Sequence, residues 1–372
     1  MPYTAATVQL LSTEGKLVSS DASAEYLPIV EKLSDEQLRD FHRHMVVIRR
    51  FDIEAANLQR QGQLALWIPS IGQEAAQVGS GFAAKPQDHI FPAYREHVVG
   101  RIRGVDPMRI IEMLRGLSHG GWDPAEHGNF HLYTLVIGSQ TLHATGYAMG
   151  LQFDGVTATG NPDTDQAVMV YFGDGATSQG DVSEALIFAA SYQTPEVFFL
   201  QNNHWAISVP VTRQSRTPLY LRGAGFGMPA TQIDGNDVLA SYAVTATHLD
   251  NARGGKGPAF IEALTYRIGA HTTSDDPTKY RKDEQLAEWV ARDPIIRFEA
   301  DLRSKGAGDD FFAEIAQEGD DLAADVRKRT MALGLPPESK IFDHVYSEFH
   351  PLMEEQATWL ADYEAAFEGG EA

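Results

Sequence analysis

Apolar residues recur along the chain with two different periods, and these periods predict its secondary structure. Leu38, Phe41, Met45 and Ile48 repeat every three to four residues, which predicts a long helix that runs to about position 61. The SDEQ stretch in front of them has the form of a capping box, which starts a helix. GQEAAQVGSGFAA and GSQTLHATGYAMGLQ predict two further helices, and the second is rich in small residues.

Short apolar runs alternate with helical segments in the middle of the chain. DHIF, AVMVYF, VFFLQ and AFIEALTYRI each end at a turn or polar loop, which predicts buried strands. Between the second and third runs, Asp181 with Glu184 three residues later predicts a capped helix. Strands that alternate with helices predict an α/β fold, in which helices flank a parallel sheet. Residues 104–132, rich in Gly, His and turn formers, predict an irregular loop.

The pattern also divides the chain into three parts. Residues 1–30 predict a loosely structured N-terminal arm, residues 31–285 the α/β domain, and residues 286–372 a helical C-terminal extension. We find no internal repeat and no low-complexity segment. The pattern is therefore typical of one α/β domain with additions at both ends.

Composition removes several classes of function. The formal net charge of the 372 residues is −21 and no basic face is visible, which excludes nucleic acid as an expected partner. No apolar run is long enough to span a bilayer, and the N-terminus fits neither a signal nor a transit peptide, so we expect a cytoplasmic protein with no membrane partner. There is no cysteine, which excludes disulfides, thiolate catalysis and cysteine-ligated zinc.

The stretch FGDGATSQGD begins at the end of the apolar run AVMVYF. Its glycines are typical of a phosphate-binding loop, but Asp174 places a negative charge between the first two of them. Asp174 follows one predicted strand and Asn203 follows the next, 29 positions later (203 − 174). The carboxyl ends of parallel strands lie on one edge of a sheet, so these two residues can converge. A carboxylate and an amide oxygen suit Mg²⁺, which commonly completes its shell with phosphate oxygens and water. The two motifs together therefore predict a metal-bridged diphosphate, whereas either alone is more often a plain turn.

A second glycine-rich motif matches a binding fingerprint but lacks the structural context that the fingerprint requires. GSGFAA, at residues 79–84, matches the dinucleotide fingerprint G-x-G-x-x-A. The fingerprint requires a strand before it and a helix after it. Here a helical segment precedes the motif and Pro86 interrupts any helix behind it, so we reject a dinucleotide site.

GDG followed by 26 residues (176–201) and then NN is the thiamine diphosphate signature. Over nearly its full length the chain resembles the alpha subunit of the decarboxylating component of 2-oxoacid dehydrogenase complexes. The matching stretches are IGQEAAQVGSG, FPAYREH, FGDGATSQGDVSEAL, QNNHWAIS, IDGNDVLA and TYRIGAHTTSDDPTKYR. The last is very close to the branched-chain form of the family, and residues 104–134 match least. The resemblance implies a thiamine-diphosphate-binding α/β fold.

The resemblance also implies roles for individual residues. Asp174, Asn203 and the carbonyl of Trp205 would bind Mg²⁺. His271 would be the catalytic acid/base, since the unperturbed pKa of histidine suits proton transfer near neutrality. The residues implied to contact the cofactor are Tyr94, Arg95, Leu135, Ile137, Gly173, Asp174, Gly175, Ala176, Asn203 and His271. A potassium ion found in some branched-chain relatives would map to Thr134, Ser139 and Gln140.

The resemblance implies partners as well. A separate beta subunit would supply a glutamate to activate the cofactor and complete an α2β2 heterotetramer. A lipoyl-bearing acyltransferase component would accept the acyl group. RIGAHTTSDDPTKYR favours branched-chain 2-oxoacids, with pyruvate as the main rival and acetoin as a third option. A non-catalytic assembly or regulatory subunit is the alternative from another class. A serine phosphorylated in mammalian relatives corresponds to Thr272, and nothing in the sequence indicates regulation.

Overall fold

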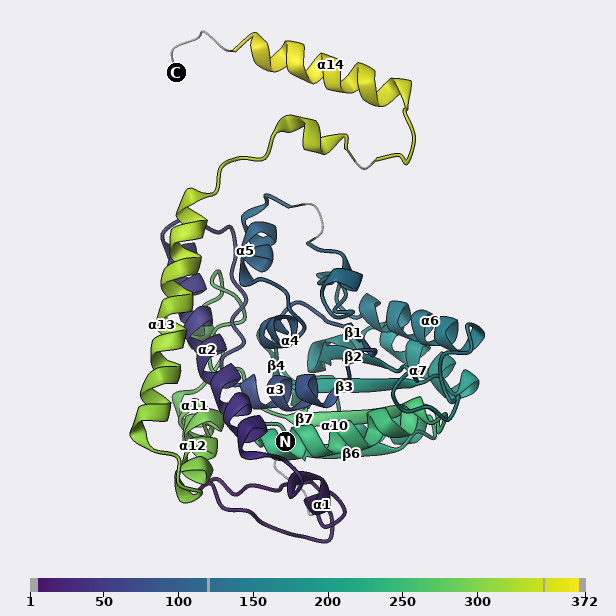
Figure 1. Cartoon of the computed structure of the whole chain (residues 1–372), viewed down its shortest axis with the longest axis vertical. Helices are drawn as coiled ribbons and strands as arrows, with labels where there is room; N and C mark the ends of the chain where they lie inside the picture. Colours follow the sequence, from purple (N-terminus) through teal and green to yellow (C-terminus); the bar gives the residue numbers. More distant parts are fainter. Residues whose placement is uncertain (1–5, 119–120, 344, 368–372) are drawn as a thin grey trace. The chain divides into compact units, whose positions relative to one another are not determined.

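A parallel sheet forms the centre of the molecule, as the sequence predicts. The computed structural model describes residues 6–118, 121–343 and 345–367 (Figure 1). Within these residues a five-stranded sheet has the order β1-β2-β3-β7-β6, and every neighbouring pair is parallel. Its strands are β1 (His89–Phe91), β2 (Val168–Gly173), β3 (Glu196–Asn202), β7 (Ala259–Leu264) and β6 (Ala230–Asp234). A short antiparallel hairpin, β4 (Trp205–Ala206) with β5 (Val209–Pro210), follows β3.

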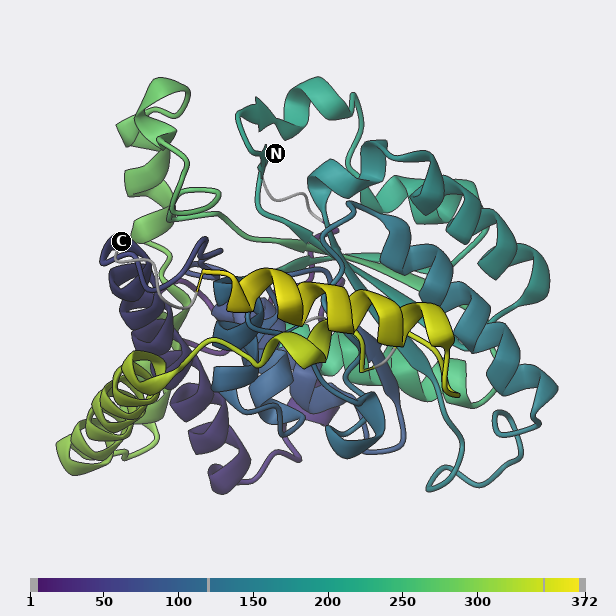
Figure 2. The ribbon, with the colours of Figure 1, turned by 90° about the horizontal axis from the view of Figure 1, so that it is seen from above.

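Helices cover both faces of the sheet (Figures 1 and 2). One face packs alternate strand residues, such as Val170, Phe172 and Leu200, into a hydrophobic cluster with α6 (Ser139–Phe153) and α7 (Gly180–Tyr192). The other face contacts α10 (Val238–Arg253), which packs in turn on α3 (Glu74–Ala83). The predicted α/β architecture is confirmed.

Most predicted helices are present with the expected starts. The long helix is α2 (Asp35–Arg60), and its capping box forms because the backbone N–H of Gln37 donates to Ser34 Oγ at 3.2 Å. The Ser34 N–H donates in return to Gln37 Oε1 at 3.0 Å. GSGFAA lies largely within α3, so the rejected dinucleotide motif has no strand in front of it. The other helices near the site are α4 (His97–Ile102), α8 (Val211–Gln214) and α9 (Tyr220–Gly225).

Two local predictions were wrong, and one strand was missed. Asp181 does not cap α7: the N-cap is Gln179, and the helix starts directly from the preceding 3₁₀ turn η2 (Asp174–Ser178). The predicted loop 104–132 contains α5 (Pro107–Arg115), which begins where Asp106 accepts from the Met108 N–H at 3.0 Å. It also contains the short 3₁₀ turn η1 (Pro124–Glu126). Strand β6 was not predicted because its ATQID sequence is short and largely polar.

The N-terminal arm is attached to the domain rather than loosely structured. Val8 pairs with Ile233 at the edge of the sheet. The backbone N–H groups of Leu10 and Leu11 both donate to Asp237 Oδ2, at 2.7 and 2.6 Å. After them comes the short helix α1 (Leu27–Val30). The buried Asp237 carboxylate therefore fixes the arm at the start of α10.

The C-terminal part is helical from Asp283, as predicted. Its elements are the helices α11 (Asp283–Val290), α12 (Pro294–Ser304), α13 (Asp309–Ala332) and α14 (Pro351–Ala365) and the 3₁₀ turn η4 (Glu338–Ile341), and another 3₁₀ turn, η3 (Pro277–Lys279), comes before α11. Arg327 Nε on α13 donates to Glu54 Oε1 on α2 at 2.6 Å, so α13 lies beside α2. The chain divides into two compact units, Met1–Met331 and Ala332–Ala372. The domain boundaries proposed from the sequence remain a prediction.

One of the buried carboxyl groups lies at the amino end of β3, the central strand of the sheet. Glu196 begins β3 and is fully buried, and two hydroxyls contact it: Thr145 Oγ1 at 3.2 Å and Thr194 Oγ1 at 3.3 Å. Burial raises the pKa of Glu196 to about 8.

In the described part of the chain, no helix is long and apolar enough to cross a membrane.

Candidate active site

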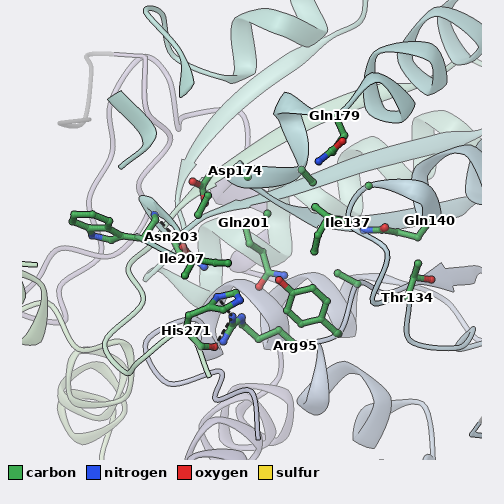
Figure 3. A pocket seen from close by; sticks show the side chains of 18 of the residues that line it. Arg95, Thr134, Ile137, Gln140, Asp174, Gln179, Gln201, Asn203, Ile207 and His271 are labelled. Atoms are coloured by element: carbon green, nitrogen blue, oxygen red, sulfur yellow. Dashed lines mark hydrogen bonds between the residues drawn. The ribbon is translucent and has the colours of Figure 1, made fainter. Parts of the chain in front are cut away.

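Four neighbouring strands each deliver one predicted site residue at their carboxyl ends. Arg95 follows β1, Asp174 follows β2, Asn203 follows β3 and His271 lies beyond β7. All four line one cavity of about 260 Å³ (Figure 3). The convergence expected from parallel strands is therefore observed.

Asp174 is a buried carboxylate without a basic partner. Its side chain is on η2, and Oδ2 accepts from Gln214 Nε2 at 2.8 Å. Among the described residues, no Lys, Arg or His lies within ion-pair distance of this carboxylate. Burial raises the pKa of Asp174 to about 6, and the hydrogen bond from Gln214 opposes that rise. A bound cation would relieve the same penalty.

Asn203 and Trp205 present oxygen atoms on the same edge. Asn203 Nδ2 donates to Gln73 Oε1 at 3.4 Å, while its Oδ1 accepts from the Trp205 N–H at 3.2 Å. An amide oxygen has two lone pairs, so Oδ1 keeps one for a further partner. The Trp205 carbonyl accepts from Arg267 Nη1 at 3.3 Å. One carboxylate, one amide oxygen and one carbonyl form a hard donor set that suits Mg²⁺.

Arg95 is a buried cation that no carboxylate neutralises within the described residues. Its Nη1 donates to the Pro69 carbonyl, and its Nη2 donates to the His271 carbonyl at 3.2 Å. Its neighbour Glu96 is also buried and lines the same cavity, but the two side chains form no ion pair: Glu96 Oε1 accepts from Gln201 Nε2 at 2.6 Å and Glu96 Oε2 accepts from the backbone N–H of Arg95 at 3.1 Å. The guanidinium of Arg95 thus borders the cavity without an ion-pair partner among the described residues, which suits an anion such as phosphate.

His271 is held neutral. Burial lowers its pKa to about 4, and the positive charges of Arg95 and Arg267 add to the effect. Its Nδ1 lies 3.4 Å from Arg95 Nη2, and since a guanidinium can only donate, Nδ1 is the acceptor. The proton of the neutral ring is therefore on Nε2, where it is available as a hydrogen-bond donor.

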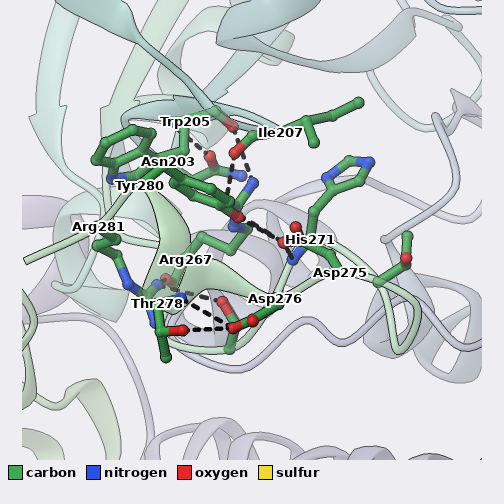
Figure 4. A network of polar contacts seen from close by, with 12 residues as sticks. Asn203, Trp205, Ile207, Arg267, His271, Asp275, Asp276, Thr278, Tyr280 and Arg281 are labelled. Atoms are coloured by element: carbon green, nitrogen blue, oxygen red, sulfur yellow. Dashed lines mark hydrogen bonds and ion pairs between the residues drawn. The ribbon is translucent and has the colours of Figure 1, made fainter.

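A polar network fixes the loop that carries His271 (Figure 4). The fully buried Arg267 donates to the Ile207 carbonyl at 2.8 Å and to the Tyr280 hydroxyl at 2.6 Å. Tyr280 donates in turn to Asp275, which also accepts from the His271 N–H at 2.8 Å. The network connects the His271 loop to the hairpin that presents the Trp205 carbonyl.

Two polar atoms on the cavity wall lack partners. Gln73 Nε2 and Gln140 Oε1 are buried and make no hydrogen bond to any described residue. Buried polar groups are normally satisfied, so such atoms point to a missing ligand. Together with the unpaired charges of Asp174 and Arg95, they fit a ligand that carries both a divalent cation and anionic oxygens.

Close packing explains one glycine of the loop. A Cβ atom at Gly175 would lie 2.8 Å from Ala206 Cβ, which is closer than real Cβ contacts. The GDG loop and the β4–β5 hairpin therefore touch only because residue 175 has no side chain. Ile207, next in the hairpin, has a left-handed φ of +53° although it is β-branched, and it lines the cavity. Such backbone strain is concentrated at functional sites.

The other predicted site residues divide into two groups. The predicted residues that also line the cavity are Tyr94, Thr134, Ile137, Gln140, Gly173, Gly175, Ala176 and Trp205. Leu135 and Ser139 do not line it, and the side chain of Leu135 is exposed. Sequence reasoning missed nine residues of the site. Eight of them line the cavity, namely Gln73, Ala93, Glu96, Gly138, Gln179, Gln201, Ala206 and Ile207, and the ninth, Gln214, contacts Asp174. All but Gly138 and Gln214 lie in the motif stretches IGQEAA, FPAYREH, FGDGATSQGD and QNNHWAIS, but no spacing rule singled them out.

Comparison with known proteins adds the family. The model of the family described as "Dehydrogenase E1 component" matches residues 42–326. The chain belongs to this family. Among the relatives of this E1 chain, the 3-methyl-2-oxobutanoate dehydrogenase subunit alpha of Mycobacterium tuberculosis is 43% identical over 88% of each chain. The pyruvate dehydrogenase E1 component subunit alpha of Acholeplasma laidlawii is 38% identical over 87% of this chain and 93% of its own length. The corresponding Bacillus subtilis subunit is 35% identical over 91% of this chain and 86% of its own length.

Membership in the dehydrogenase E1 family confirms the resemblance seen in the motifs. The chain is an enzyme subunit of the 2-oxoacid dehydrogenase class, and the family implies dependence on thiamine diphosphate. It also implies a beta subunit and a larger complex. Among the described residues, no cluster of three or more His, Asp or Glu side chains could hold a metal ion.

Proposed function

We propose that this E1 chain is the alpha subunit of a branched-chain 2-oxoacid dehydrogenase. The reaction is the oxidative decarboxylation of 3-methyl-2-oxobutanoate with transfer of the acyl group to a lipoyl arm. The observation that carries the proposal is the meeting of Arg95, Asp174, Asn203 and His271 at one cavity. The 43% identity to the mycobacterial branched-chain subunit supports the substrate. Pyruvate is the alternative, because two pyruvate-type relatives are 35–38% identical.

The donor set of the cavity supports thiamine diphosphate with Mg²⁺ as the cofactor. Asp174, Asn203 and the Trp205 carbonyl would hold the metal. Arg95 and Tyr94 would hold the diphosphate against the backbone at Gly173, Gly175 and Ala176, and Leu135 and Ile137 would contact the aminopyrimidine through their backbones. When bound, the cofactor supplies the carbon nucleophile and electron sink that decarboxylation of a 2-oxoacid requires. A potassium ion at Thr134, Ser139 and Gln140 is part of the proposal.

His271 moves protons in this scheme. Its neutral imidazole carries hydrogen on Nε2, so at neutral pH it can donate a hydrogen bond to a developing oxyanion, and it can transfer a proton once the ring has first gained one. Arg95 beside it disfavours a lasting positive charge on the ring. The network of Arg267, Tyr280 and Asp275 holds the backbone of His271 while the proton is transferred.

The proposal includes partners. A beta subunit would complete an α2β2 heterotetramer and contribute the activating glutamate, and a lipoyl-bearing acyltransferase would receive the acyl group. The chain alone should therefore be nearly inactive. Titration calorimetry with thiamine diphosphate in the presence of the beta chain separates this enzyme from a non-catalytic assembly subunit. Binding should require Mg²⁺ and disappear with a chelator, whereas an absence of metal-dependent binding would reject the enzyme assignment.

Substrate choice is tested with the assembled heterotetramer. The ratio of kcat/KM for 3-methyl-2-oxobutanoate to that for pyruvate is measured with a lipoyl-domain acceptor. Each added methylene in an apolar pocket contributes about 1–3 kcal/mol, so we expect roughly a tenfold or greater preference for the branched substrate. The His271→Ala variant, which should bind cofactor and lose acyl transfer, is the control for turnover at this site. A preference for pyruvate would favour the alternative.

A further inference from the structure

The carboxylate of Asp174 is oriented by a side chain outside the predicted ligand set. Gln214 Nε2 donates to Asp174 Oδ2 at 2.8 Å, and Asp174 Oδ1 receives no hydrogen bond from any described side chain. Gln214 Oε1 accepts from Ser178 Oγ at 3.3 Å. The carboxylate selects the amide orientation, because a rotated amide would set its oxygen against Asp174, and the Ser178 hydroxyl donates to the oxygen that this orientation leaves free.

Gln214 is placed by a fixed element. It ends α8 (Val211–Gln214), and Val211 is buried in the hydrophobic cluster of the sheet. The Val211 N–H donates to the His204 carbonyl at 3.0 Å, which ties α8 to the segment that contains Asn203. The donor to Asp174 therefore comes from the same segment that supplies the other two predicted ligands.

We propose that Gln214 is the positioning residue of the metal site, holding Asp174 Oδ2 so that Oδ1 is presented to the divalent cation. This rests on the proposed function, in which Asp174 binds Mg²⁺. Groups that hydrogen-bond metal ligands from outside commonly change metal affinity by about 10–100-fold when removed. An amide suits this position because it orients the carboxylate without neutralising it. A Lys or Arg there would form an ion pair with Asp174 and compete with the cation.

The test measures metal binding directly. The wild-type chain with its beta subunit is titrated with Mn²⁺ at fixed thiamine diphosphate, and free Mn²⁺ is counted by electron paramagnetic resonance. Gln214→Met removes the amide at similar volume, and we expect half-saturation at a roughly 10–100-fold higher Mn²⁺ concentration. Gln214→Asn withdraws the amide by one methylene and should give the same direction of change. The Gln214→Asn variant tests the same hydrogen bond if the Gln214→Met variant fails to fold.

A matched control is available on the surface. Gln317 Nε2 on α13 donates to Asp321 Oδ1, also at 2.8 Å and far from the cavity in sequence. Gln317→Met removes the same kind of hydrogen bond and should leave Mn²⁺ half-saturation unchanged.

Cofactor affinity at saturating Mn²⁺ distinguishes a role in orienting Asp174 from a general loosening of the site. If Gln214 only positions a metal ligand, the affinity for thiamine diphosphate should return to within about twofold of wild type once Mn²⁺ is saturating. Unchanged Mn²⁺ half-saturation in both Gln214 variants, or a cofactor defect that saturating metal does not restore, would overturn the inference and leave the proposed function standing. Failure of the wild type to bind Mn²⁺ with thiamine diphosphate would overturn both.

Discussion

Substituting Gly175 by alanine gives the sharpest test of how the cavity is built. The added Cβ would lie 2.8 Å from Ala206 Cβ, whereas two carbon atoms in contact prefer about 3.5–4.0 Å. Neither atom belongs to a flexible side chain, so the GDG loop and the β4–β5 hairpin must move apart by about 1 Å. Overpacking of this kind costs roughly 1–3 kcal/mol.

That displacement separates the predicted metal ligands. Asp174 precedes residue 175 in the loop, and the Trp205 carbonyl precedes Ala206 in the hairpin. A misplacement of about 1 Å in a catalytic constellation can reduce function by about 100-fold. We therefore expect Gly175→Ala to fold, to unfold a few degrees lower, and to bind thiamine diphosphate with Mg²⁺ at least about tenfold more weakly.

The assay is titration calorimetry of the heterotetramer beside a thermal unfolding scan. Gly180→Ala is the matched control, because it lies in the same FGDGATSQG stretch and its Cβ would meet no atom within 4 Å. The control should bind cofactor like the wild type. Equal cofactor affinity in Gly175→Ala and Gly180→Ala would refute the argument that the loop–hairpin contact sets the ligand geometry.

Two further predictions concern polar groups. Tyr280→Phe removes the hydroxyl that joins Arg267 to Asp275. Because hydrogen bonds to charged groups contribute about 1.5–3 kcal/mol, the His271 loop should open more often and limited proteolysis should cut it faster than in the wild type. Unchanged cleavage would contradict the network's role. Glu196→Gln should stabilise the fold increasingly with pH. The folded pKa of Glu196 is raised from 4.5 to about 8, so its contribution to stability is greatest below about pH 4.5 and is lost as pH rises through 8. The variant should gain on the order of 4 kcal/mol over wild type near pH 8 and almost nothing near pH 4.5 in denaturant titrations; a pH-independent difference would argue against a buried charge.

The strand ends were the part of the site that the sequence predicted best. Asp174 and Asn203 directly follow apolar runs, so the rule that parallel strands end at one edge was enough to bring them together. The sheet itself was predictable for the same reason, because β2, β3 and β7 are buried on both faces and have nearly continuous apolar sequences.

The parts of the site that the sequence could not predict depend on contacts between distant segments. Gln214 is 11 positions beyond Asn203 (214 − 203) in a polar stretch without periodicity, and only the fold brings it to Asp174. Strand β6 is a short edge strand with a polar composition, so no apolar run identified it. Asp181 was interpreted as a cap because local spacing cannot show that a 3₁₀ turn already leads into the helix at Gly180.

Two buried charges at the cavity lack ion-pair partners among the described residues, so the stability of the folded chain should depend on how much cofactor is bound. The buried carboxylate of Asp174 and the buried guanidinium of Arg95 each lack an ion-pair partner among the described residues, and each raises the free energy of the folded protein. A ligand that binds only the folded state adds RT ln(1 + [L]/Kd), about 2.7 kcal/mol at a concentration 100 times its Kd. A cell short of the vitamin would then lose the protein as well as its activity, since an unliganded subunit spends more time open to proteases.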